Sequence, residues 1–260
     1  MGGVTDAGAA KSGMVTDAGA VQGAGGAAAA ATPAIGSLDT TNTPVGLWLF
    51  DDDLTDSSGN GLTLTAEAGT ASYTELGGKT WIHFDGALRL IEATTAASLA
   101  ILGDMTCTVV MKWLVPPSTT AQYIVNKGDA GDAAENTNAN YVLYQSSTLL
   151  KYLHEYGVGT NSTIAQITTP TTTHLFSSPF MLTMVRDGTN ILMYIGAQLM
   201  STTSVSGQTP TGGGSGDLYI GDDSDGSDFL TDCLISGVKI TASALSAAQV
   251  KAEYELVFGG

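Results

Sequence analysis

The sequence predicts an all-β sandwich or jelly roll over residues 45–260, closed by one short helix. Two observations carry this prediction. At least ten short apolar runs, several alternating with period two, are separated by turns rich in Gly, Asp and Ser. Only one segment, near the C-terminal end, carries convincing helix signals. Many short strands with turn signals at this spacing are typical of two packed antiparallel sheets.

The expected strands begin just after Pro44, and Asp-Gly pairs mark two of the turns between them. Asp85-Gly86 predicts a hairpin between its flanking strands, and Asp187-Gly188 predicts a second turn. The strands are expected at 46–50, 62–65, 81–84, 87–91, 106–115, 123–125, 141–144, 149–155, 180–186, 191–195, 218–220 and 233–241.

The helix is expected at 247–256. Ser246 is a suitable N-cap, and a Gln three residues later completes a capping box. Val250, Tyr254 and Val257 then fall on one helical face. We expect this face to cover an open end of the sandwich.

Residues 1–44 form a separate, low-complexity arm. They are mainly Gly, Ala, Thr and Ser, contain no aromatic residue, and repeat the hexapeptide Val-Thr-Asp-Ala-Gly-Ala at 4–9 and 15–20. Two copies are too few for a solenoid and indicate a local duplication. We expect an extended arm that is disordered in isolation. Ordering backbone costs about 1–2 kcal/mol per residue, so neighbouring chains would have to hold the arm in place.

The charge of the chain is strongly negative. Nine Lys and Arg stand against 25 Asp and Glu, for a net charge of −16. Such a surface repels phosphate backbones and anionic lipids, which argues against nucleic-acid binding. The charge keeps a Gly- and Thr-rich β protein soluble, while a cationic partner or Ca²⁺ remains the alternative explanation.

The sequence contains no predicted membrane span or export signal. No stretch reaches the roughly 18 apolar residues of a membrane helix. The N-terminus lacks the basic start and apolar run of a signal peptide. We expect synthesis in a cytoplasm, no membrane insertion, and export only by lysis or a specialised route.

Both cysteines lie in apolar, strand-like runs. Cys107 alternates with Val109, Met111 and Trp113, so these four side chains should share one strand face. Small secreted domains that depend on disulfides carry more cysteines than this chain. Free buried thiols at Cys107 and Cys233 are therefore favoured over a single bridge.

An ordered set of motifs spans nearly the whole of 45–260. It comprises Gly-Leu-Trp-Leu-Phe-Asp at 46–51, Asp-Ser-Ser-Gly-Asn-Gly at 56–61, Phe-Asp-Gly at 84–86, Leu-Tyr-Ile-Gly at 218–221, Ile-Ser-Gly-Val-Lys-Ile at 235–240 and Ala-Leu-Ser at 244–246. These motifs resemble the laminin-G-like branch of the concanavalin A-like superfamily. The resemblance implies a concanavalin A-like jelly-roll sandwich. Where that family often has acidic residues, this chain has Ser236-Gly237, which argues against a family-type metal or ligand role on that strand.

The loop at 56–61 must reverse the chain tightly. Gly59 and Gly61 can supply positive φ angles, while Asp56 and Ser58 can bond local backbone N–H groups.

Catalytic patterns are absent from the sequence. Retaining glycoside hydrolases of the resembled superfamily place their carboxylates on one strand face as Glu-x-Asp-x-x-Glu, and no such string occurs. His154-Glu155 is a lone adjacent pair whose side chains should face opposite ways. His83 and His174 have no partners at zinc-ligand spacing. We expect no enzymatic activity.

Calcium is the one cofactor with candidate ligands. Residues 222–228 hold four carboxylates, and Asp51–Asp53 add three more. Hard oxygen ligands at this density suit Ca²⁺. The string lacks the ligand order of an EF-hand, and a solvated acidic turn is the alternative. The candidate ligands are Asp222, Asp223, Asp225 and Asp228.

Aromatic residues could supply a platform for a sugar ring. Tyr144, Tyr152 and Tyr156 are the candidates, because an aromatic face stacks well on a pyranose. Packing in the core is the alternative explanation for each of them.

These features favour a non-enzymatic structural or decorating protein of a virion, with a tailed bacteriophage as the expected source. Laminin-G-like sandwiches recur on virion surfaces, so the resemblance fits this setting. Residues 1–44 would anchor an outward-facing sandwich to capsid or tail subunits, and we expect a homo-oligomer on the virion surface. Host surface glycans are candidate ligands. The alternative is a carbohydrate-binding or adhesion module of a cellular surface protein.

Overall fold

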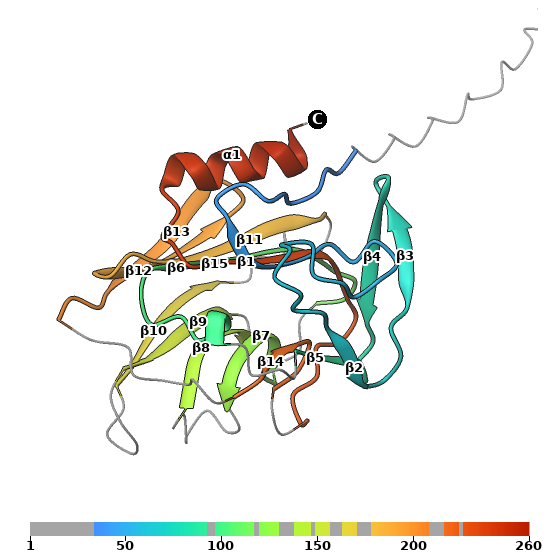
Figure 1. The fold of residues 1–260 in the computed structure, drawn as a ribbon, viewed down its shortest axis with the longest axis horizontal. Helices are drawn as coiled ribbons and strands as arrows, with labels where there is room; N and C mark the ends of the chain where they lie inside the picture. Colours follow the sequence, from blue (N-terminus) through green and yellow to red (C-terminus); the bar gives the residue numbers. More distant parts are fainter. Residues whose placement is uncertain are drawn as a thin grey trace, which may run out of the picture. The chain divides into compact units, whose positions relative to one another are not determined.

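The structure is a computed structural model, drawn as a ribbon in Figure 1. It describes residues 34–92, 97–116, 120–129, 138–146, 149–156, 163–170, 178–207, 216–223 and 226–259. The chain divides into two units, Met1–Ala31 and Thr32–Gly260. The first unit, and with it most of the predicted arm, lies outside the described residues. Everything below concerns the second unit.

Strands dominate the described part of the chain. In it, no helix is long and apolar enough to span a membrane. The elements are β1 (Pro44–Trp48), β2 (Thr65–Ala68), β3 (Tyr73–Leu76), β4 (Lys79–Phe84), β5 (Arg89–Glu92), η1 (Ala97–Leu99), β6 (Met105–Trp113), β7 (Gln122–Asp129), β8 (Asn138–Ser146), β9 (Leu149–Tyr156), β10 (Thr163–Pro170), β11 (Phe180–Arg186), β12 (Asn190–Ile195), β13 (Gln198–Ser204), β14 (Leu218–Ile220), β15 (Cys233–Thr241) and α1 (Ala247–Phe258).

The strands form two antiparallel sheets. Sheet A has eight strands, in the order β13-β12-β11-β6-β15-β4-β3, with β1 also paired to β15. Sheet B has seven, in the order β10-β9-β8-β7-β14-β5-β2. The predicted all-β sandwich with one short C-terminal helix is confirmed.

The main core lies between the sheets. Cys107, Val109, Met111 and Trp113 of β6 all point into it, which confirms the predicted face. Each large side chain removed from water in this way contributes about 1.5–3 kcal/mol. Cys107 and Cys233 are buried free thiols, as predicted. Burial raises the pKa of Cys107 to about 12 and that of Cys233 well above its usual value.

A second apolar layer lies on the outer face of sheet A. Val250 and Val257 of α1 are buried there together with Val110, Met181 and Trp81 of the sheet. Figure 1 shows α1 on the side of sheet A that faces away from sheet B. The expectation that the helix covers an open end of the sandwich is therefore wrong. The outward-facing positions of the central strands are apolar, so the helix covers a sheet face. The predicted capping box of α1, between Ser246 and Gln249, is confirmed.

Residues 34–43, the last part of the predicted arm, lie along this same layer. Ile35 and Leu38 are buried in the cluster under α1. The Ile35 N–H donates to the Gly77 carbonyl at 2.9 Å, and the Gly36 N–H donates to the Val257 carbonyl at 2.8 Å. The last ten residues before β1 are thus fastened to the sandwich by packing and backbone bonds.

The loop at 56–61 has the predicted construction. Gly59 and Gly61 have φ angles of 89° and 75°. The Asp56 carboxylate accepts the backbone N–H groups of Leu47, Ser58 and Leu62 at 2.8–3.0 Å. One side chain therefore holds both ends of the reversal.

The hairpin predicted at Asp85-Gly86 is wrong. β4 pairs with β15 and β3 in sheet A, whereas β5 pairs with β14 and β2 in sheet B. Gly86 does have the positive φ that a turn requires, at 89°. The turn nevertheless carries the chain from one sheet to the other, because a local turn signal does not determine which strands pair. The turn at Asp187-Gly188, by contrast, joins the paired strands β11 and β12.

Strand assignment also failed at the sheet edges. The sequence analysis missed β3, β10 and β13, and it placed a strand at 62–65 where β2 begins only at Thr65. Leu62 and Leu64 are buried as their alternation predicts, but they belong to the preceding loop. All four of these strands lie at the ends of the two sheets.

Candidate functional site

Three connections cross between the sheets at one end of the sandwich. They join β4 to β5, β6 to β7 and β14 to β15. In sheet A, Cys233 lies opposite both Phe84 and Trp113, so these three strands end at one level. In sheet B, Ile220 lies opposite Val125 and next to β5. The sheet topology therefore brings the described residues of three loops together, 85–88, 114–116 with 120–121, and 221–223 with 226–232.

The third of these loops is tied to the other two. Its backbone closes on itself and bonds both to β7 and to the β4–β5 turn. The bonds run from Gly221 N–H to Ile124 O (3.2 Å), Tyr123 N–H to Asp228 O (3.2 Å), Leu230 N–H to Gly221 O (2.7 Å) and Gly86 N–H to Leu230 O (3.1 Å). These backbone bonds fix the position of the loop on the sandwich.

Gly221 is essential to this arrangement. Its φ is +90°, and a Cβ added there would lie 2.2 Å from a ring carbon of the buried Phe84. Only glycine combines this backbone angle with so close an approach. The loop can therefore leave β14 in the observed direction only with glycine at this position.

A cleft of about 320 Å³ opens between the three loops. This is near the lower limit of ligand pockets, roughly 300–1,000 Å³, and suits a ligand about the size of one sugar ring. A hydrogen bond from the Gln122 amide to the Thr231 hydroxyl joins two of its walls. Phe229 is half-buried in the lining and Ser227 is exposed. The described lining comprises Gly86, Thr120, Ala121, Gln122, Ser227, Asp228, Phe229 and Thr231.

The chemistry of this lining suits a polyhydroxylated ring. The Phe229 ring offers an apolar face, on which the C–H face of a sugar can lie. The Asp228 carboxylate is a strong acceptor for sugar hydroxyls. Hydroxyl groups from Ser227, Thr120 and Thr231 can both donate and accept hydrogen bonds.

Two of the predicted Ca²⁺ ligands point into their own loop. Asp222 and Asp223 are buried. One oxygen of Asp222 accepts the Asp228 N–H at 3.1 Å, and one oxygen of Asp223 accepts the Gly226 N–H at 3.1 Å. Burial raises the pKa of Asp222, and the N–H groups of Asp223 and Asp228 and the charge of Arg89 offset only part of that rise.

The Ca²⁺ site stays a prediction. Asp228 lines the cleft, and Asp225 lies outside the described residues. Among the described residues, no three His, Cys, Asp or Glu side chains converge as a metal site would require. In the second acidic run, Asp51 pairs with Lys79 and Asp53 accepts the Thr55 N–H.

Arg89 is a residue that sequence reasoning missed. Its guanidinium lies 2.8 Å from the Glu67 carboxylate and 3.5 Å from that of Asp222, and donates to the Asp223 carbonyl at 3.3 Å. It also lies over the ring of Tyr219, at 5.7 Å from the centroid. The sequence signal that could have identified Arg89 is its position: it is a basic residue three positions after the Phe-Asp-Gly motif at 84–86, in a chain of strongly negative charge.

Tyr144 does not form an exposed platform. It is buried, and its ring stacks on Tyr123 with the centroids 5.3 Å apart. The two residues lie opposite each other on β7 and β8, so packing is the correct explanation for Tyr144. The side chains of Tyr152 and Tyr156 on β9, like those of His154-Glu155, lie outside the described residues.

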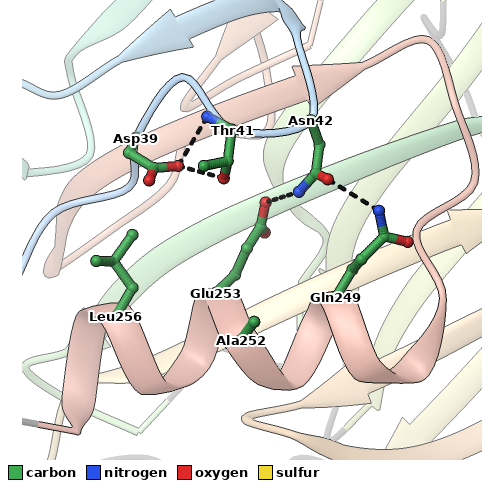
Figure 2. A pocket seen from close by; sticks show the side chains of 7 residues that line it. All are labelled: Asp39, Thr41, Asn42, Gln249, Ala252, Glu253 and Leu256. Atoms are coloured by element: carbon green, nitrogen blue, oxygen red, sulfur yellow. Dashed lines mark hydrogen bonds between the residues drawn. The ribbon is translucent and has the colours of Figure 1, made fainter.

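A second hollow, of about 270 Å³, lies between residues 39–42 and α1 (Figure 2). Its polar side chains bond one another: the Gln249 amide donates to Asn42 at 2.9 Å, and the Asn42 amide donates to Glu253 at 3.4 Å. Below it, Lys239 lies 2.6 Å from Glu253, and both are buried. We name residues 34–43 together with α1 the clasp. These hydrogen bonds link the two parts of the clasp across the hollow.

Solved structures with the same fold include binding domains of botulinum neurotoxins. The receptor binding domain of the C/D mosaic serotype has a TM-score of 0.65 at 13% identity, over 82% of this chain and 51% of that one. The binding domain of neurotoxin DC in complex with SialylT gives 0.64 at 13%, over 83% and 52%. The same domain in complex with rat synaptotagmin II gives 0.61 at 13%, over 84% and 52%. This chain spans about half the length of each, and the likeness shows the fold.

A search of curated proteins finds no match for the chain. Residues 85–251, more than half of the chain, match the family described as the concanavalin A-like lectin/glucanases superfamily. The chain therefore belongs to the concanavalin A-like lectin/glucanases superfamily.

Proposed function

We propose that this chain is a non-catalytic binding protein that recognises carbohydrate in the cleft between its inter-sheet loops. The carrying observation is the cleft itself, where an aromatic ring, a carboxylate and several hydroxyl groups meet at the end of the sandwich. Membership of a superfamily of lectins and glucanases supports a sugar ligand. The backbone bonds that hold the 221–232 loop give the cleft a preformed shape, which reduces the entropy lost on binding.

The composition of the cleft supports binding without catalysis. Glycoside hydrolysis uses two carboxyl groups that face each other across the bond, about 5–9.5 Å apart. In the described lining, Asp228 supplies the one carboxylate. The nearby Asp222 and Asp223 are buried and bonded within the loop, so they are not positioned to face a bound sugar.

A glycan array followed by calorimetry tests the proposal. Phe229→Ala and Asp228→Asn should each weaken binding of the sugars that score on the array at least tenfold, because they remove the stacking face and the charged acceptor. Leu199→Ala is the control, since it truncates an exposed apolar side chain on the edge strand β13. Unchanged affinity in both cleft variants, or no glycan bound by the wild type, would contradict the proposal. Circular dichroism confirms that each variant is folded.

We also propose that residues 1–44 attach the sandwich to a larger assembly, as a decorating protein on the surface of a virion would require. The clasp supports this attachment role, because Ile35 and Leu38, which follow the first part of the arm in the chain, are packed in the layer under α1. A force that pulls on the arm would therefore act on this packed layer. A capsid or tail subunit of a bacteriophage would then be the partner, with several copies on one particle. The alternative setting is a carbohydrate-binding or adhesion module of a cellular surface protein.

Deletion of residues 2–33 separates these settings, because it removes the part of the arm that precedes the clasp and leaves the clasp intact. The shortened chain should fold and bind sugar as the full chain does. It should remain in the supernatant when the full chain co-sediments with virus particles of its source. Full co-sedimentation of the shortened chain would contradict anchoring by the arm.

A further inference from the structure

The charges around the cleft bear on which sugars can enter it. Asp228 is part of the lining. Two more exposed carboxylates are next to other lining residues in the sequence. Asp85 directly precedes Gly86, and Asp232 directly follows Thr231. No Lys or Arg belongs to the described lining.

Two cations lie on strands that adjoin the cleft loops, Arg89 on β5 and Lys112 on β6, and both are directed away from the cleft. Arg89 is held by Glu67 and Asp222 behind the loop. Lys112 lies opposite Leu234, which is buried in the layer under α1, so this lysine belongs to the outer face of sheet A. Neither is available to neutralise an anionic ligand in the cleft. The net charge of −16 adds a repulsive field at longer range.

From these observations we infer that the cleft selects uncharged or cationic sugars and rejects sialylated, sulfated or uronic acid glycans. This inference rests on the proposed function and specifies its ligand class. Like charges brought close together in a partly desolvated cleft repel strongly, whereas a neutral hydroxyl donates to Asp228 without repulsion. An amino sugar gains a charge-assisted hydrogen bond at the same position.

Paired ligands that differ in charge test the inference. The array should carry each glycan core with and without sialic acid or sulfate, and N-acetylglucosamine trimers beside glucosamine trimers. Neutral cores should bind at least tenfold more tightly than their anionic forms, a difference of about 1.4 kcal/mol. The glucosamine trimer should bind more tightly than its acetylated form at low salt, and this advantage should shrink as the salt concentration rises.

Asp228→Asn identifies the source of the discrimination. This variant should bind neutral sugars more weakly. It should also reduce the ratio of the affinities for neutral and anionic forms at least threefold. Asp52→Asn is the control: it removes one exposed charge distant from the cleft in sequence, at a φ of 62° that asparagine tolerates. Anionic forms that bind as tightly as neutral ones would overturn the inference while leaving carbohydrate binding intact. An array on which no glycan of either class binds would overturn both.

Discussion

The buried ion pair between α1 of the clasp and strand β15 allows a quantitative prediction. Lys239 Nζ lies 2.6 Å from Glu253 Oε1, and the two side chains are only 1% and 3% exposed. The second oxygen of Glu253 accepts the Thr108 hydroxyl at 3.3 Å. Asp39 lies 3.6 Å from Lys239 and is more exposed. The pair therefore joins β15, α1 and the clasp residues before β1.

Glu253→Gln removes one charge and preserves the shape of the side chain. Breaking a buried pair from one side costs about 3–5 kcal/mol, because the other charge is left uncompensated. Asp39 compensates part of the Lys239 charge, so we expect a loss near 3 kcal/mol in the free energy of unfolding. For a unit of this size, each kcal/mol shifts the Tm by about 2–4 °C, which gives a decrease of about 6–12 °C.

Urea unfolding and calorimetry measure this loss, and the chain offers a matched control. Lys251 and Glu255 form an exposed pair on the same helix, at 2.9 Å and i,i+4 spacing. Glu255→Gln should cost no more than about 0.5 kcal/mol. The double variant Lys239→Met with Glu253→Leu should recover most of the stability, since apolar replacement of a buried pair is often neutral. Equal losses for Glu253→Gln and Glu255→Gln would refute the reasoning.

Two further predictions concern the loops. Burial alone would raise the pKa of Asp56, but the N–H groups of Ser58, Leu62 and Leu47 outweigh it and hold the pKa below its usual value. Such a carboxylate stabilises the fold above its unfolded pKa of about 3.9, and this stabilisation is lost as the pH falls through the folded pKa. Asp56→Asn should therefore cost about 2 kcal/mol at pH 7 and clearly less at pH 2–3, in urea unfolding at both pH values; a pH-independent loss would contradict this. Gly221→Ala should cost about 2–4 kcal/mol, from left-handed backbone strain and collision with Phe84. Gly59→Ala is its control, because that position has a similar φ but open space, and should cost about 1 kcal/mol; similar losses in the two variants would argue against the collision.

The central strands were predictable from the sequence because their surroundings impose a clear pattern. Alternate residues of β6 face the core, and Cys107, Val109, Met111 and Trp113 show that period directly. The edge strands β2, β3 and β13 lack such a constraint. Most of β13 is exposed, including Leu199 and Met200, so neither face of the strand requires apolar residues. For this reason the sequence analysis missed β3 and β13 and misplaced β2.

The candidate cleft was only partly predictable. The acidic run at 222–228 stood out in the sequence, but its density of carboxylates did not show that Asp222 and Asp223 turn inward while Asp228 lines a cleft. Phe229 and Thr231 looked like ordinary loop residues. No local pattern relates them to Gly86 and Gln122, which lie more than 100 positions earlier in the chain.

The sequence by itself determined the all-β class, the capped helix after Ser246, the tight loop at Asp56 and the acidic charge. Each of these depends on residues that are close together in the chain, so local patterns record them. Only the tertiary structure decided that Asp85-Gly86 crosses between sheets, that α1 covers the outer face of sheet A, and that three loops enclose a cleft. These features depend on which strands pair across long separations, and strand pairing is set by the packing of the whole core rather than by any single turn.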